Sequence, residues 1–204
     1  MTSPPSRAGH SQPTEPRTTL MIHRKLFGGL AVALALSAAT QIPASASTGA
    51  SASSLANDLL PSAYASKIGF PTVVDKVTTS DTGKKACPLD ADEAFESAKG
   101  KLALISGAAL CTTSQGAAMI LKSARSSTSA TSASPPKQLG SSAIERSSGG
   151  SVYEIYWLRG RTLEVVKIYA VIGSRHRRPI TSAQQKILSS AAVEQNGLVA
   201  RITT

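Results

Sequence analysis

The chain has 204 residues, a formal net charge of +10 and only two cysteines. Of its three histidines, only His176 lies beyond residue 46, and Asp and Glu together number 12. This shortage argues against a metal centre, which needs about four ligands, and against hydrolases, which need a positioned base. We therefore expect no catalytic residues, no cofactor and no metal site, and the sequence indicates no specific activity.

The first 46 residues have the pattern of an export signal. Residues 1–20 are rich in Pro, Ser and Thr, so we expect a disordered or untranslated leader, with Met21 as the alternative start. From Met21 a basic stretch is followed by the apolar run 26–39 and by a small-x-small cleavage site that ends at Ala46. The run is shorter than the ~20 residues of a spanning helix, although an uncleaved anchor is the alternative. We predict a signal peptide over 21–46 and a secreted, extracellular product without a further transmembrane span.

The product, residues 47–204, is long enough for one domain with a real core. Residues 1–46 hold four basic residues and one acidic residue, so their removal lowers the net charge from +10 to +7. A basic secreted protein can meet anionic envelope polymers or lipid headgroups, or its charge can simply keep it soluble. We expect a flexible lead-in over 47–57 and a single domain over 58–204.

The elements of this domain follow from hydrophobic periodicity and from capping signals. Residues 72–79 read as a strand, and Asp90 with Glu93 predicts a capped helix that Gly100 ends. Residues 101–112 are apolar and fit a strand better than a helix, 114–125 predict a helix, and 138–146 a strand. The Ser/Ala-rich segment 126–136 predicts a disordered loop. Thr181 and Gln184 open a last helix, which we expect to end at Gly197.

Cys87 and Cys111 are the only cysteines of the chain. An even pair in an oxidising compartment favours a disulfide, and two buried free thiols are the alternative.

Residues 152–158 and 162–172 form the strongest pattern, a β-hairpin that turns at Arg159-Gly160. With that pair at the turn, Leu158 lies opposite Arg161 and Tyr156 opposite Leu163. Alternation gives one core face, which carries Trp157 and has Thr162 and Glu164 as polar members. The other face mixes apolar and polar groups as a ligand surface does, and as an ordinary solvent-facing sheet also does. Its candidate ligand-binding residues are Glu154, Tyr156, Arg161, Leu163, Lys167 and Tyr169.

The densest charge cluster follows the hairpin. It holds Arg175, His176, Arg177 and Arg178, a candidate anion-binding set for phosphate, teichoic acid or lipid headgroups. The alternative is a solvated loop. No aromatic residue is interleaved with these charges, so we expect no nucleic-acid partner.

Several of these segments resemble the extracellular sensor domain of mycobacterial PknH-type Ser/Thr kinases and its free-standing secreted relatives in actinobacteria. The similar parts are Leu59-Leu60-Pro61 with Gly69-Phe70, residues 109–121, the hairpin segment 156–161, and the Ala/Gln-rich C-terminal helix. The resemblance implies an α+β fold, a twisted antiparallel sheet with helices packed mainly on one face, and a cleft for an unknown extracellular ligand. This chain has no kinase domain, and one possible disulfide where the kinase sensors have two.

Two functions from different classes, and a more distant third, follow from these observations. The first is a secreted, non-enzymatic ligand-binding or sensor-like domain of the bacterial envelope, whose partner is a small molecule or an envelope polymer. The second is a basic envelope-associated protein that binds anionic polymers or lipid headgroups. The third is a small enzyme with an unrecognised site.

Overall fold

The computed structural model describes residues 52–79, 85–126, 134–171 and 179–200. All of these residues belong to one compact unit, Ala46–Thr204. The predicted leader and signal peptide over 1–46 lie outside the described residues. Within the described ranges, no helix has the length and apolar character needed to cross a membrane.

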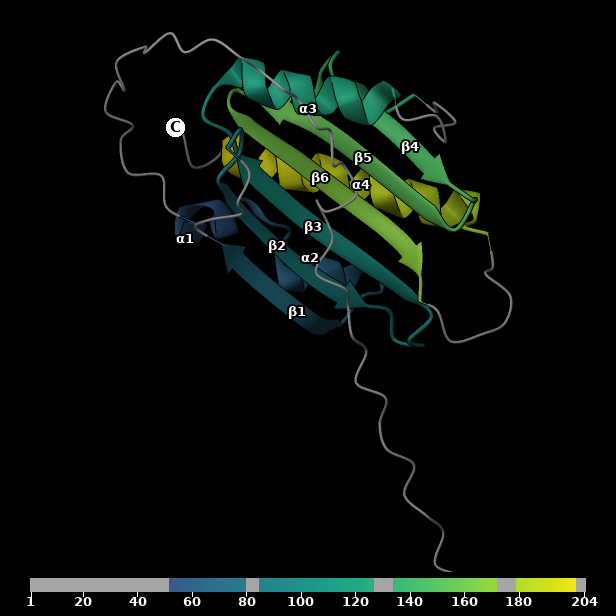
Figure 1. Cartoon of the computed structure of the whole chain (residues 1–204). Helices are drawn as coiled ribbons and strands as arrows, with labels where there is room; N and C mark the ends of the chain where they lie inside the picture. Colours follow the sequence, from purple (N-terminus) through teal and green to yellow (C-terminus); the bar gives the residue numbers. More distant parts are fainter. Residues whose placement is uncertain (1–51, 80–84, 127–133, 172–178, 201–204) are drawn as a thin grey trace, which may run out of the picture. The chain divides into compact units, whose positions relative to one another are not determined.

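Six strands form one antiparallel sheet in the order β1-β2-β3-β6-β5-β4 (Figure 1). The strands are β1 (Thr72–Thr79), β2 (Leu89–Glu96), β3 (Leu102–Leu110), β4 (Ile144–Ser148), β5 (Val152–Arg159) and β6 (Thr162–Ala170). Strands β1 to β3 make one meander and β4 to β6 another, and the pairing of β3 with β6 joins the two at the centre of the sheet. The predicted α+β class with an antiparallel sheet is confirmed.

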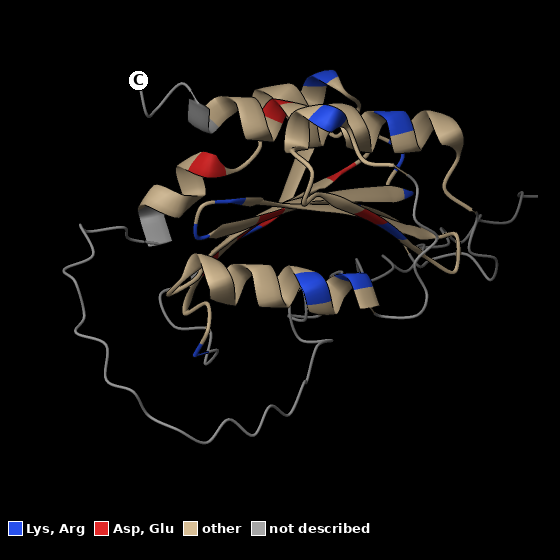
Figure 2. Cartoon of the chain, turned by 90° about the horizontal axis from the view of Figure 1, so that it is seen from above, with Lys and Arg blue, Asp and Glu red and all other residues tan. Residues whose placement is uncertain are grey.

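The helical elements lie on both faces of the sheet, most of them on one face. They are α1 (Ala52–Leu55), η1 (Ala56–Asp58), α2 (Ser62–Lys67), α3 (Ser114–Ser126), η2 (Lys137–Leu139) and α4 (Ser182–Ala200). Helices α1, α2 and α4 pack on one face, where they bury its apolar residues. Helix α3 lies on the opposite face, where it packs on β4, β5 and β6. Figure 2 shows helices on both sides of the sheet. The expectation of helices mainly on one face is therefore correct, and α3 is the exception.

The main core lies between the sheet and α4. Trp157 and Phe95 are its largest fully buried side chains, and they pack with Leu104, Ile168 and Leu188. The Trp157 face of the hairpin was predicted to face the core and the last helix to cover it, and both predictions are confirmed. Burial of such apolar area is the dominant favourable contribution to folding, at roughly 25 cal/mol per Å².

The N-terminus of α4 has the predicted capping box. The backbone amide of Thr181 donates to Oε1 of Gln184 at 2.7 Å, and the amide of Gln184 donates to Oγ1 of Thr181 at 3.3 Å. The predicted stop at Gly197 is wrong, because α4 runs on to Ala200. Gly197 does not take the left-handed conformation that ends helices, so it costs helix propensity without breaking the helix.

The predicted helix at residues 90–100 is wrong, and this segment is strand β2. Strand β2 is an interior strand that pairs with β1 on one side and β3 on the other. Glu93 does not cap a helix; its Oε2 atom lies 3.2 Å from Nζ of Lys76 across the strand pair. Pairing on both sides overrides the local capping signal, because tertiary context outweighs propensity. The preferred strand for 101–112 is confirmed as β3.

Part of the lead-in predicted over 47–57 packs on the domain instead. Residues Ala52–Leu55 form α1, and Leu55 is buried with Leu59 against Ala91 and Ala108. Apolar burial explains the difference, because the segment gains stability when its leucines pack against a face of the sheet. Of the low-complexity loop 126–136, residues 127–133 lie outside the described residues.

The hairpin has the predicted faces but a different register. Leu158 lies opposite Leu163, and Tyr156 lies opposite Val165, so the turn residues are Gly160 and Arg161. Gly160 has a φ of 58°, which a residue without a side chain accommodates most easily. The shift moves the partner of each residue by two positions, and this preserves the two faces.

Candidate functional site

The candidate ligand-binding residues lie on the α3 side of the hairpin, but they do not form one site. Leu163 is only 2% exposed and packs with Leu121, Ala124 and Ile144 beneath α3. Tyr156 is half-buried beside the same cluster. Leu163 is therefore a core residue in this structure, with little surface to offer a ligand.

Arg161 lies at the opposite end of β6 from Tyr169. Eight residues of extended strand separate them, or roughly 26 Å. Nη1 of Arg161 donates to the carbonyl of Thr112 at 3.3 Å, and its own carbonyl accepts from the amide of Cys111 at 2.9 Å. Arg161 thus connects the hairpin turn to the end of β3.

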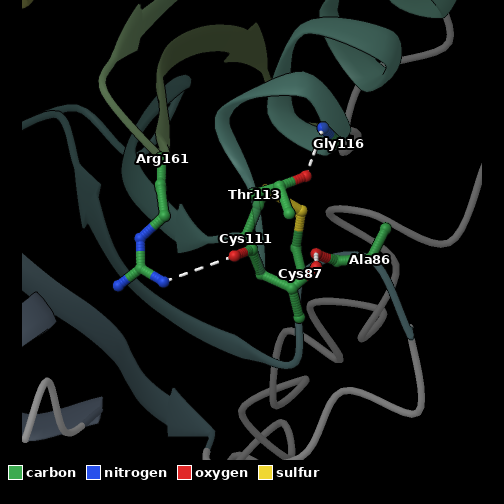
Figure 3. The surroundings of a disulfide bond; sticks show 7 residues. Ala86, Cys87, Cys111, Thr113, Gly116 and Arg161 are labelled. Carbon is green, nitrogen blue, oxygen red and sulfur yellow. Dashed lines mark hydrogen bonds between the residues drawn. A yellow bond between two sulfur atoms is a disulfide. The ribbon is translucent and has the colours of Figure 1, made fainter. Parts of the chain in front are cut away.

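The predicted disulfide between Cys87 and Cys111 is present at this end of the sheet (Figure 3). It joins the segment before β2 to the segment between β3 and α3. The amide of Thr112 donates to the carbonyl of Ala86 at 2.9 Å, and Oγ1 of Thr113 accepts from the amide of Gly116 in the first turn of α3. The disulfide and these bonds hold the beginning of α3 in place.

The remaining candidates gather in a polar group that we call the Glu154 cluster: Arg146, Glu154, Tyr156, Lys167 and Tyr169. Oε1 of Glu154 lies 2.9 Å from Nζ of Lys167, and its Oε2 lies 3.9 Å from Nη1 of Arg146. The side chains of Glu154 and Lys167 are only 12% and 23% exposed. The corrected register explains the contact, because Glu154 and Lys167 are directly opposite each other.

Aromatic rings flank this row of charges. The guanidinium of Arg146 lies over the ring of Tyr156, 5.8 Å from its centroid, within the range of a cation–π contact. Burial, followed by the charge of Glu154, raises the pKa of Tyr156, and burial, followed by the charge of Glu96, raises the pKa of Tyr169. Both phenols are therefore neutral at ordinary pH.

The Glu154 cluster has an excess of one positive charge and a spare donor. Glu154 is shared by two cations, so the five residues of the cluster carry a net charge of +1, and the next carboxylate along the sheet is Glu96, near Tyr169. Nε of Arg146 is buried and has no hydrogen-bond partner among the described residues. Incompletely paired, half-buried charges interact more strongly with an incoming ion than exposed charges do, because less water screens them.

A second polar group was not predicted, and we call it the Glu164 network: Asp58, Ser106, Arg159, Glu164 and Gln195. Glu164 is fully buried on the α4 side of the sheet. Its Oε2 accepts from Nε2 of Gln195 at 2.8 Å, and its Oε1 lies 3.1 Å from Nη2 of Arg159. The same Nη2 atom lies 3.2 Å from Oδ2 of Asp58.

Part of the signal for this network is visible in the sequence. Alternation places Glu164 on the core face of the hairpin, and a buried carboxylate requires partners. The partners are out of reach of sequence reasoning, because Gln195 and Asp58 are 31 and 106 positions away from Glu164 in the chain.

The basic segment Arg175, His176, Arg177 and Arg178 lies outside the described residues. The structure therefore supplies no geometry for the predicted anion-binding set. In the parts of the chain that are described, no group of three or more His, Cys, Asp or Glu side chains could hold a metal ion.

No protein-family model matches the chain, and no curated protein matches it significantly. The similarity to the PknH-type sensor domains remains a prediction from the sequence.

Proposed function

We propose that this chain is an exported, non-enzymatic binding domain of the cell envelope, and that the Glu154 cluster is its ligand surface. The signal-peptide pattern over 21–46 supports export. The Cys87–Cys111 disulfide also supports it, because such bonds persist in oxidising compartments. The resemblance to the PknH-type sensor domains supports a sensor-like role, in which another protein would transmit any signal.

One observation carries the assignment of the site. Glu154 is the only carboxylate that makes an ion pair with either cation of the cluster in the described structure, and it serves both Arg146 and Lys167. An organic anion would compensate the excess positive charge and could accept from Lys167. The neutral phenol of Tyr169, two positions along the same face of β6, offers a ring against which an aromatic or aliphatic group could pack. The expected ligand class is therefore a small anion that also carries an apolar group.

The experiment follows backbone amide signals of the isotopically labelled full chain during titration with phenyl phosphate, benzoate and phenethylammonium. The two anions should produce saturable shifts in residues 152–156 and 165–169. The cation, which carries a similar ring and the opposite charge, should not. Absence of saturable shifts in these strands with both anions would overturn the assignment.

Two variants separate binding at this cluster from general attraction to a basic protein. Lys167→Met and Tyr169→Ala should each weaken the anion-induced shifts at least threefold. Lys122→Met removes the same charge from an exposed position on α3 and should leave them unchanged. Equal weakening by Lys167→Met and Lys122→Met would indicate non-specific attraction and contradict the proposal.

A further inference from the structure

The Glu164 network connects four parts of the chain that are distant in sequence. Asp58 belongs to η1, Ser106 to β3, Arg159 and Glu164 to the hairpin, and Gln195 to α4. Oγ of Ser106 donates to Oε1 of Gln195 at 2.7 Å and accepts from the backbone amide of Leu60 at 2.9 Å. Through Asp58 and Leu60, the network fastens the N-terminal segment, residues 52–60, to the sheet and to α4.

The charges of this network do not balance when all groups have their ordinary ionisation. Arg159 supplies one positive charge, while Asp58 and Glu164 supply two negative charges. Among the described residues, the other groups that hydrogen-bond in the network are neutral: Gln195 from α4, and the Ser106 hydroxyl and Gly107 carbonyl from β3. The network becomes neutral when it binds one proton.

Glu164 is the group best placed to hold that proton. Its side chain is 1% exposed, whereas the side chain of Asp58 is 18% exposed. Burial is the main cause that raises the pKa of Glu164, to about 7. Arg159 and the hydrogen bond from Gln195 lower it, and the charge of Asp58 raises it further. Burial also raises the pKa of Asp58, against the opposing effect of Arg159.

We propose that the Glu164 network is a proton-operated latch, which holds residues 52–60 against the sheet when Glu164 is protonated and loosens when Glu164 loses its proton. This proposal is independent of ligand binding at the Glu154 cluster. The network is the polar part of the attachment of this segment. The apolar part consists of Leu55 and Leu59, which pack with Ala91 and Ala108, and of Leu60, which is buried in the main core.

The direction of the effect follows from proton linkage. The latched state binds the proton more tightly than an opened state, in which water reaches Glu164 and its pKa falls towards the ordinary value of 4.5. The latch is therefore strongest below about pH 4.5 and loses stability as the pH rises to about 7. Within this window the opening constant should increase by up to about tenfold per pH unit.

Hydrogen exchange of the full chain at pH 5 and pH 7.5 tests the latch. After correction for intrinsic exchange rates, protection of the Leu60 amide, which donates to Ser106, should fall roughly tenfold to a hundredfold at the higher pH. Amides within α3, which lies on the other face of the sheet, should change much less. Protection of Leu60 that is equal at both pH values, or that falls no more than protection in α3, would overturn the proposal.

Variants identify the titrating group. Glu164→Gln keeps a neutral side chain of the same shape and should reduce the pH effect at Leu60 to less than about threefold. Asp58→Asn removes the carboxylate that opposes ionisation of Glu164 and should move the transition to lower pH. A carbon-13 titration of the Glu164 carboxyl in the unmodified chain does not depend on whether either variant folds. A midpoint near the ordinary value of 4.5 would refute the latch.

Discussion

Replacement of Gln195 by Leu should strongly destabilise the domain, although the side-chain volume hardly changes. Gln195 is fully buried, and it accepts from Ser106 at 2.7 Å and donates to the carbonyl of Gly107 at 3.2 Å and to Glu164 at 2.8 Å. A Leu side chain cannot form these hydrogen bonds, so the groups of Ser106, Gly107 and Glu164 that bonded to Gln195 stay buried and each lose one bond. A buried hydrogen bond contributes about 1 kcal/mol, and an orphaned partner costs about 1–3 kcal/mol. We expect the free energy of unfolding to fall by about 3 kcal/mol.

Urea unfolding measures this loss. For a domain of this size, a slope near 2 kcal/mol per molar urea converts the expected loss into a midpoint that is lower by about 1.5 M. Fluorescence of Trp157, the single tryptophan, reports the core, and far-ultraviolet circular dichroism reports the secondary structure. Gln185→Leu makes the same change at a half-buried position of α4 and should alter stability by less than about 0.5 kcal/mol.

The role of Ser106 gives a second check on the same reasoning. If Gln195 stabilises the domain through Ser106, then Ser106→Ala should cost less in the Gln195→Leu background than in the unmodified chain. A midpoint shift below about 0.5 M for Gln195→Leu, with an unchanged slope, would show that the buried amide contributes little.

Other predictions concern the disulfide, the core and pH. Replacement of Cys87 and Cys111 by Ser opens a loop whose ends are 24 positions apart and should cost about 3 kcal/mol in urea unfolding; a variant as stable as the oxidised protein would contradict this. Leu188→Ala should cost about 2–5 kcal/mol because Leu188 is fully buried, whereas Met119→Ala, at a side chain 48% exposed, should cost under about 1 kcal/mol. Burial, and then the charges of Asp90 and Asp75, raise the pKa of Asp92 to about 6, so its ionisation destabilises the fold as the pH rises from 3.8 towards 6. Asp92→Asn should therefore raise the melting temperature at pH 7 more than at pH 4, and an equal shift at both values would refute this.

The two faces of the hairpin were predictable because side chains alternate strictly along a strand. Trp157 and Ile155 therefore faced the core in the prediction as they do in the structure. The register was not predictable, because turns at Arg159-Gly160 and at Gly160-Arg161 give the same faces. The structure selects the second turn, which brings Arg159 within 3.1 Å of Glu164 and places Glu154 opposite Lys167.

Strand β2 was wrongly predicted as a helix because the capping pattern is a local feature of the sequence, whereas the strand is stabilised by pairing with distant segments. Asp90 and Glu93 have the spacing of a capping box, but the segment lies between two other strands that satisfy its backbone. By contrast, the capping box at Thr181 and Gln184 was predicted correctly, because α4 covers a face of the sheet and needs no strand partner.

The candidate site was predictable only in part. The sequence places Glu154, Tyr156, Lys167 and Tyr169 on one face of the hairpin. It contains no sign that Arg146 of β4 completes the cluster, or that α3 covers Leu163. Both facts depend on which distant segments pack together, and local periodicity does not contain this information.

The division of the sheet into two meanders has a consequence for assembly. Strands β1 to β3 and β4 to β6 meet only where β3 pairs with β6, and the chain between the halves runs through α3 and η2. In a dimer, β3 of one molecule could pair with β6 of a second molecule in the same way as it pairs with β6 of its own chain. The geometry therefore favours exchange of whole halves in a domain-swapped dimer when the connecting segment is shortened, because a short connection prevents the closed arrangement within one chain.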